Sequence, residues 1–322
     1  MLHRAIKKDF CPFPPTRERA GTPTRWSKLL FNLKSRAVGA DRRPDVLRLQ
    51  HVGLGTLIPS SAAKSRCREN EMLEVCVEDI GGLRAAMEGG ADRVELCAAL
   101  AVGGITPSPA LIRAAAAMSI PIHMLVRPRA NDFVYDADET EVMVADIREA
   151  VGAGLAGVVI GASRPDRTLD APLLATLIAV AREAGDSRGS PVSLTLHRAF
   201  DLCPDPGAAL EVAVGLGFDR VLTSGGAVSA AGGLTVLADL VKQARGRIRI
   251  LAGSGITPEN VGSILATGVE EIHASCQAPR PRTDPKAIEL GFDEAQPKRT
   301  SAERITALAA SIQQWYANSA RP

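Results

Sequence analysis

The chain has 322 residues, of which 46% are hydrophobic and only 3% aromatic, and its formal net charge is +2. This length fits one large α/β barrel or two average domains. No apolar run reaches the length of about 18 residues that a membrane helix needs, and no basic stripe is interleaved with aromatic residues. We therefore expect neither a membrane span nor nucleic-acid binding. The six cysteines have no framework spacing, which favours a reduced, intracellular protein.

Residues 1–71 differ from the rest of the chain in composition. Residues 1–70 carry 15 Lys and Arg against 5 Asp and Glu, and prolines are frequent there. We interpret residues 1–71 as a basic, Pro/Arg-rich extension that is disordered, is a targeting leader, or precedes a true start at Met72. Residues 72–322 are expected to form one domain.

The first regular pattern lies between Leu73 and Cys97. Leu73–Val77 alternates apolar and polar residues as a strand does, Leu83–Met87 favours a helix, and Asp92–Cys97 has the pattern of a second strand. This order predicts a βαβ unit with a parallel pair of strands.

The same alternation of strand and helix continues to the end of the chain. Further strands are predicted at Ile120–Val126, Gly157–Gly161, Val192–His197, Asp219–Thr223, Ile248–Ala252 and Glu270–Ala274. Helices are predicted at Leu111–Met118, Thr140–Ala153, Asp170–Ala184, Asp205–Val214, Leu234–Ala244, Thr257–Ala266 and Ser301–Trp315, with a long loop at Cys276–Lys298. Eight strand–helix units in about 245 residues predict a (β/α)8 TIM barrel. An open, doubly wound sheet would need a Gly-rich fingerprint after the first strand, which is absent.

Two strand-end cysteines are candidate metal ligands. Glu74 and Cys76 share one face of the first strand, and Glu95 and Cys97 share one face of the second, because strand residues two apart point to the same side. Thiolates prefer Cu(I) or Zn(II), so Cys76 and Cys97 could form a soft-metal site; the alternative is two buried thiols that only pack. Further candidate ligands are Cys203, His197 and His273.

Basic and Gly-rich segments at other strand ends indicate an anion site. In a barrel the carboxyl ends of the strands form the active face, and phosphate often binds after the seventh and eighth strands. A phosphate or carboxylate could be bound there, although the glycines could equally serve only to close loops. The candidate ligand-binding residues are Arg127, Arg129, Ser224, Gly225, Gly253, Ser254 and Gly255.

Acid–base catalysis is a third possibility, with Glu95, His197 and Asp201 as the candidate catalytic residues. The alternative is a structural network in which Arg198 pairs with Asp201 or Asp92.

Several motifs together resemble the copper homeostasis protein CutC family from about Leu73 to Ser275. They are Leu73–Cys76, Gly90–Cys97, Gly103–Ser108, Arg127–Arg129, Asp132–Tyr135, His197–Asp201, Leu222–Gly225 and Ala252–Gly255. The resemblance implies a cytoplasmic TIM barrel that commonly assembles as a homo-oligomer. It also implies Cu(I) as a tentative cofactor or cargo, with ligands that fall on Cys76 and Cys97.

This sequence departs from the family pattern in places. Residues 1–71 lie outside it, and Val77 stands where some relatives have a tandem cysteine. A pure copper carrier would not need Arg127, His197 and Asp201 beside its thiols. The alternative function is therefore a TIM-barrel enzyme or sensor that acts on a small anionic metabolite, a phosphate or a carboxylate.

Overall fold

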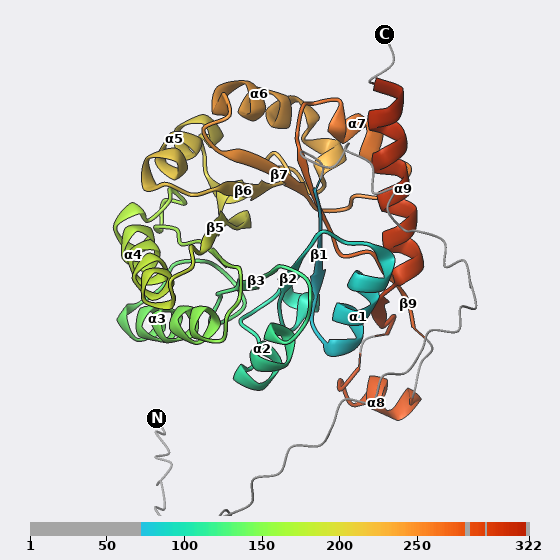
Figure 1. The fold of residues 1–322 in the computed structure, drawn as a ribbon, viewed down its shortest axis with the longest axis horizontal. Coiled ribbons are helices and arrows are strands. Elements are labelled where there is room, and N and C mark those ends of the chain that lie inside the picture. The colour runs from blue at the N-terminus through green and yellow to red at the C-terminus, as the bar shows by residue number, and fades with distance from the viewer. Residues whose placement is uncertain (1–71, 281–283, 294, 320–322) are drawn as a thin grey trace, which may run out of the picture. The chain divides into compact units, whose positions relative to one another are not determined.

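Eight parallel strands close into a barrel in the computed structural model, which describes residues 72–280, 284–293 and 295–319 (Figure 1). Neighbouring strands pair in sequence order, and β8 pairs with β1 to close the ring. The predicted (β/α)8 barrel is confirmed. The strands are β1 (Met72–Val77), β2 (Arg93–Leu96), β3 (Ile122–Leu125), β4 (Gly157–Ile160), β5 (Ser193–Leu196), β6 (Arg220–Thr223), β7 (Arg249–Gly253) and β8 (Glu271–Ala274). The predictions of a disordered extension, a leader or a late start concern residues 1–71, which lie outside the described residues.

A ring of helices covers the barrel (Figure 1). After the last strand, α9 packs between α1 and α7 and completes this ring. The helices are α1 (Ile80–Gly89), α2 (Pro109–Ala116), α3 (Ala137–Gly152), α4 (Ala171–Arg188), α5 (Pro206–Leu216), α6 (Leu234–Ala244), α7 (Val261–Leu265), α8 (Pro285–Glu289) and α9 (Ala302–Ser319).

Local sequence explains where many of these helices begin and end. An aspartate side chain caps the first turn of α1, α3, α4 and α5, where it accepts a hydrogen bond from a backbone N–H. Glycines with positive φ follow α1, α4 and α5, the backbone conformation that usually ends a helix.

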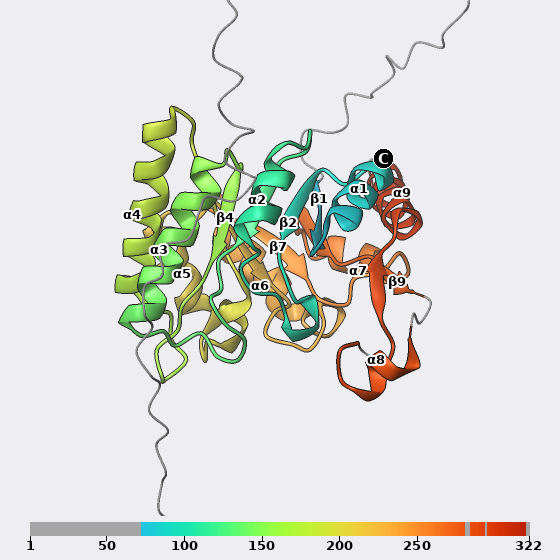
Figure 2. The ribbon, with the colours of Figure 1, turned by 90° about the horizontal axis from the view of Figure 1, so that it is seen from below.

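Two predicted segments differ in the structure. The predicted loop at Cys276–Lys298 contains the short strand β9 (Gln277–Pro279) and helix α8, and β9 pairs antiparallel with β10 (Lys298–Thr300). Figure 2 shows α8 and β9 at the outer side of the barrel, with β9 next to α7 and α8 below it at the lower right. The helix predicted at Thr257–Ala266 is shorter, because the Asn260 side chain accepts the Thr257 N–H and holds residues 257–260 in a turn.

The apolar core lies mainly between the sheet and the helices. Inside the barrel, the buried apolar cluster contains only Cys76, Cys97, Leu125 and Val159. Buried charged and polar side chains fill much of the remaining interior, whereas TIM-barrel interiors are usually packed with bulky branched residues. This polar interior lies directly beneath the candidate site.

Within the described residues, none of the helices has both the length and the apolar character needed to cross a bilayer.

Candidate functional site

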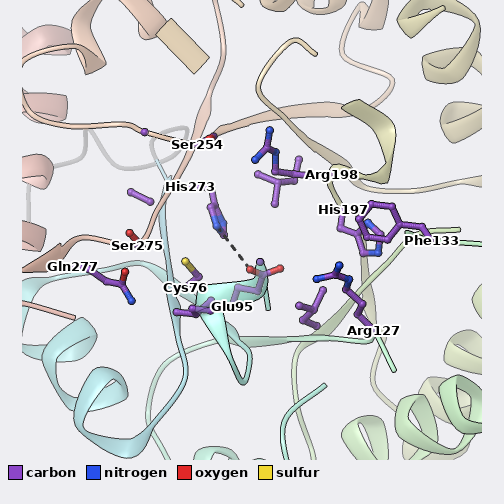
Figure 3. Close-up of a pocket in the computed structure, with 16 residues that line it drawn as sticks. Cys76, Glu95, Arg127, Phe133, His197, Arg198, Ser254, His273, Ser275 and Gln277 are labelled. Atoms are coloured by element: carbon purple, nitrogen blue, oxygen red, sulfur yellow. Dashed lines mark ion pairs between the residues drawn. The ribbon is translucent and has the colours of Figure 1, made fainter. Parts of the chain in front are cut away.

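A pocket of about 330 Å³ opens at the carboxyl ends of the barrel strands. Five of its lining side chains fall into two groups that lie on different sides in Figure 3. Cys76, Glu95 and His273 form the first group. Arg127 and His197 form the second.

Beneath the pocket, the barrel interior contains a set of ion pairs that we call the ionic layer: Glu74, Arg93, Arg220 and Glu271. The Arg93 guanidinium pairs with Glu74 and lies 2.7 Å from Glu271, whose carboxylate is 3.0 Å from Nε of Arg220. All four side chains are buried. Because each charge has an opposite partner, the layer can lie in a low-dielectric interior and form the floor of the pocket.

The first group brings three donor atoms together. Cys76, Glu95 and His273 each offer one atom, and the three atoms lie within 4.8 Å of one another. Strand pairing explains this, since Cys76 is the register partner of Glu95 and β8 adjoins β1 on its other side. His273 Nε2 is 3.8 Å from Glu95 Oε2, the contact drawn as a dashed line in Figure 3. Thiolate, imidazole and carboxylate are all metal-ligand groups.

A buried carboxylate orients the imidazole of this group. His273 Nδ1 lies 2.8 Å from Glu74 Oε1, which leaves Nε2 on the side of Glu95. Metal-binding histidines almost always make such a hydrogen bond through their second ring nitrogen.

Burial and neighbouring charges shift the pKa values of His273 and Glu95 in this group. Burial lowers the pKa of His273, but Cys76, Glu74 and Glu95 outweigh that effect and raise it well above its usual value. Burial also raises the pKa of Glu95, against the opposing charge of His273. A cation binding here would therefore compete with the proton on His273.

Cys97 lies to the side of these three donors. Its thiol is buried and donates to Glu95 Oε2 at 3.5 Å. Burial and the charge of Glu95 raise the pKa of Cys97 well above its usual value, which favours the thiol over the thiolate. The two predicted ligands therefore differ, because Cys76 belongs to the donor cluster and Cys97 contacts it through Glu95.

The second group places donors on the opposite wall. The Arg127 guanidinium lies 5.0 Å from the centroid of the Phe133 ring, and Phe133 packs against His197 with ring centroids 4.7 Å apart and planes tilted by 43°. Figure 3 shows Arg127, His197 and Phe133 side by side. Burial and the charge of Arg127 lower the pKa of His197 to about 3, so its imidazole is neutral at physiological pH.

Ser254 and Gly255 also line the pocket, whereas other predicted anion ligands do not. Arg129 points elsewhere, because Glu139 and Asp132 bind its guanidinium. Three further residues are engaged in loop packing or the barrel wall rather than in the lining: Ser224, Gly225 and Gly253.

Asp201, a predicted catalytic residue, is occupied by structural contacts. It accepts hydrogen bonds from Thr223 and from the backbone N–H groups of Ser224 and Gly226, and Arg198 Nε is 2.7 Å from its carboxylate. This arrangement is the Arg198–Asp201 network considered as the alternative. Glu95 and His197 line the pocket and Asp201 does not.

Sequence reasoning missed two features of the site. A Cβ on Gly161 would come 2.3 Å from the His197 ring, so this glycine creates the space for the imidazole. Glu74 orients His273 although the two residues are 199 positions apart. The only sequence signal for either was the inward parity of each residue on its strand.

The protein is thus a (β/α)8 barrel with a cluster of candidate metal ligands and a ligand-sized pocket at its carboxyl end. The sequence matches the CutC family model over residues 71–278. The chain belongs to the CutC family.

Individual relatives align with this chain over most of their own length. A family protein CutC from Sinorhizobium medicae is 51% identical over 242 residues, which covers 75% of this chain and 96% of the relative. One from Caulobacter vibrioides is 47% identical, with 74% and 97% covered. A crystal structure of CutC from Streptococcus agalactiae, which carries the name copper homeostasis protein, has 31% identity and a TM-score of 0.59 and covers 64% of this chain and 98% of its own.

Proposed function

We propose that this protein takes part in copper homeostasis and binds Cu(I) at the mouth of the barrel, with the Cys76 sulfur and the His273 Nε2 as its ligands. The observation that carries this proposal is the convergence of donor atoms from Cys76, Glu95 and His273 within 4.8 Å. Family membership and the name of the Streptococcus agalactiae protein point to copper as the metal.

The chemistry of the donors favours Cu(I) over hard cations. Thiolate and imidazole suit copper and zinc, whereas magnesium and calcium need mostly oxygen ligands. Glu95 is the only oxygen donor of the cluster, and burial shifts it toward its neutral form by raising its pKa. Glu95 then acts as a neighbour of the metal that donates or accepts a hydrogen bond.

The choice of His273 over Cys97 as the second ligand rests on two contacts. The bond between Glu74 and Nδ1 orients the imidazole with Nε2 toward the other donors. The Cys97 thiol instead donates to Glu95, and its raised pKa opposes ionisation. Cys97 is therefore a neighbour of the site and not a ligand in this proposal.

Anaerobic titration with Cu(I) against a chromogenic chelator tests the ligand set. Cys76→Ser and His273→Gln should each weaken binding at least about tenfold, a loss of about 1.4 kcal/mol, because each removes one of two soft donors. Cys97→Ser should change the affinity less than about threefold. Cys203→Ser is the matched control, since Cys203 is also a buried free cysteine and lies outside the donor cluster.

A two-cysteine site makes the opposite prediction. Equal losses in Cys76→Ser and Cys97→Ser, with His273→Gln unchanged, would contradict this ligand set and favour two thiolates. Unchanged affinity in all the variants would contradict a copper site in this pocket.

A further inference from the structure

We propose that the same pocket binds a small organic carboxylate, with its two oxygens against Nε of Arg127 and Nε2 of His197. This ligand is additional to copper and lies against the other wall of the pocket. Two observations support this ligand. Arg127 Nε and His197 Nε2 are buried donors without partners among the described residues, and the pocket wall that they share is positively charged.

Arg127 is a buried cation that has no carboxylate as an ion-pair partner among the described residues. Only 6% of the residue is exposed, and its terminal nitrogens donate to the backbone carbonyls of Val102, Gly104 and Asn131 at 2.7–3.0 Å. Nε has no hydrogen-bond partner among the described residues, and Arg127 forms no ion pair with any Asp or Glu in them. A buried, unpaired charge is costly unless a counter-ion reaches it. The three carbonyls hold the guanidinium in place, and an anion in the pocket would supply the missing counter-charge and a hydrogen-bond acceptor for Nε.

His197 offers a second donor, and its tautomer follows from geometry. The Ala199 N–H donates to Nδ1 at 3.1 Å, so the ring proton lies on Nε2. The residue is 4% exposed, and Nε2 has no partner among the described residues. Phe133 on one side and the bare backbone of Gly161 on the other hold the ring. A fixed, unsatisfied buried donor in a pocket wall is the feature expected of a ligand contact.

The charge of this wall favours a carboxylate over a phosphate. Arg127 is uncompensated, but Arg198, the other arginine of the pocket lining, is already paired with Asp201, and His197 is neutral. One net positive charge with two separately placed N–H donors matches a monoanion with two oxygens. A phosphate ester carries close to two charges and three acceptor oxygens, and this wall has too few free donors for it.

The rest of the pocket limits the size of the ligand. Leu100, Leu125 and Leu222 line it beside the donors, and the volume is about 330 Å³. This volume is at the lower end of ligand pockets, which run from about 300 to 1,000 Å³. The ligand class is therefore a small carboxylic acid with a short apolar body.

Isothermal titration calorimetry of the full chain, kept metal-free with chelator, tests this proposal. The probes are pyruvate, malate, succinate and benzoate, with succinamide as the uncharged control and ethyl phosphate as the phosphate. At least one carboxylate should bind with a Kd below about 1 mM, and succinamide should not.

Two variants and a control locate the binding. His197→Asn keeps an acceptor for the Ala199 N–H but removes the Nε2 donor, and Arg127→Gln removes the charge. Each should weaken carboxylate binding at least about tenfold. Arg129→Gln changes an arginine of the same loop whose charge is paired outside the pocket, and it should bind as the unmodified protein does.

Several results would overturn the proposal. These are no binding by any of the four carboxylates, equal binding to His197→Asn and the unmodified protein, or binding of ethyl phosphate alone. Because the titration is metal-free, its failure is independent of copper binding. A loss of Cu(I) affinity in Cys76→Ser with carboxylate binding retained would separate the two claims.

Discussion

Asp201 shows how a single buried carboxylate can belong to the scaffold although it follows a histidine at a strand end. Its side chain is only 7% exposed and accepts from the hydroxyls of Thr223 and Ser224 and from two backbone N–H groups of the loop after β6. Charge-assisted hydrogen bonds of this kind are stronger than neutral ones. The carboxylate therefore ties the 3-10 turn after β5 (Arg198–Leu202) to the next loop of the barrel mouth.

Asp201→Asn should lower the free energy of unfolding by roughly 1–3 kcal/mol, because the amide keeps one acceptor and turns an N–H group toward existing donors. Asp132→Asn is the control, since that aspartate is 63% exposed and its loss should cost less than about 0.5 kcal/mol. Urea denaturation of both variants measures the difference. Equal stability would contradict the scaffold role.

At the scale of the elements, β4 creates space for histidines from both neighbouring strands. A Cβ on Gly157 would lie 2.6 Å from the His123 ring, and one on Gly161, directly after the strand, would lie 2.3 Å from the His197 ring. Real Cβ contacts are essentially never this short, so an alanine at either position must displace the imidazole or the backbone.

Gly161→Ala should therefore cost about 1–3 kcal/mol through overpacking and should weaken carboxylate binding by displacing His197. Gly152→Ala in α3 has no neighbour within 4 Å of the new Cβ and should be neutral or stabilising by up to about 1 kcal/mol. Thermal melts with and without the tightest-binding carboxylate compare the two variants. If Gly161→Ala retains full stability and ligand response, the ring is not confined as described.

The elements also show how far the sequence alone could go. Apolar periodicity and glycines such as Gly90 and Gly217 were sufficient to predict the barrel, because both are local signals. The pairing of His273 with Glu74 was not predictable, since the register across the β1–β8 closure joins residues 199 positions apart. The ion pair that holds Arg129 against Glu139 and away from the pocket likewise depends on a loop conformation, and no periodic sequence pattern predicts that conformation.

At the scale of the whole molecule, buried imidazoles couple stability to pH. Burial above all lowers the pKa of both His123 and His197 to about 3. In the unfolded chain these groups titrate near about 6.5, so below that pH the unfolded chain binds protons that the folded chain does not. Stability is then fully present above about pH 6.5 and is lost as the pH falls toward about 3.

From about pH 7 to about pH 5, the two histidines together should lower the free energy of unfolding by roughly 4 kcal/mol, half of it from each. Glu95 has a raised pKa, so its contribution to stability changes with pH in the opposite direction to that of the two histidines. The pKa of His273 is also raised, and below about pH 6 this residue is protonated in both the folded and the unfolded chain. Urea denaturation at a series of pH values gives the slope, and His197→Asn should reduce it by about one proton. A protein that gains stability toward pH 5 would refute this assignment.

The central claim is that a thiolate from β1 and an imidazole from β8 meet at one copper ion. X-ray absorption at the copper K-edge of the Cu(I)-loaded protein tests it most directly, because sulfur and nitrogen neighbours scatter differently. We expect one sulfur and one imidazole nitrogen around the copper, with the sulfur lost in Cys76→Ser and retained in Cys97→Ser. Two sulfur neighbours and no imidazole signal would contradict it.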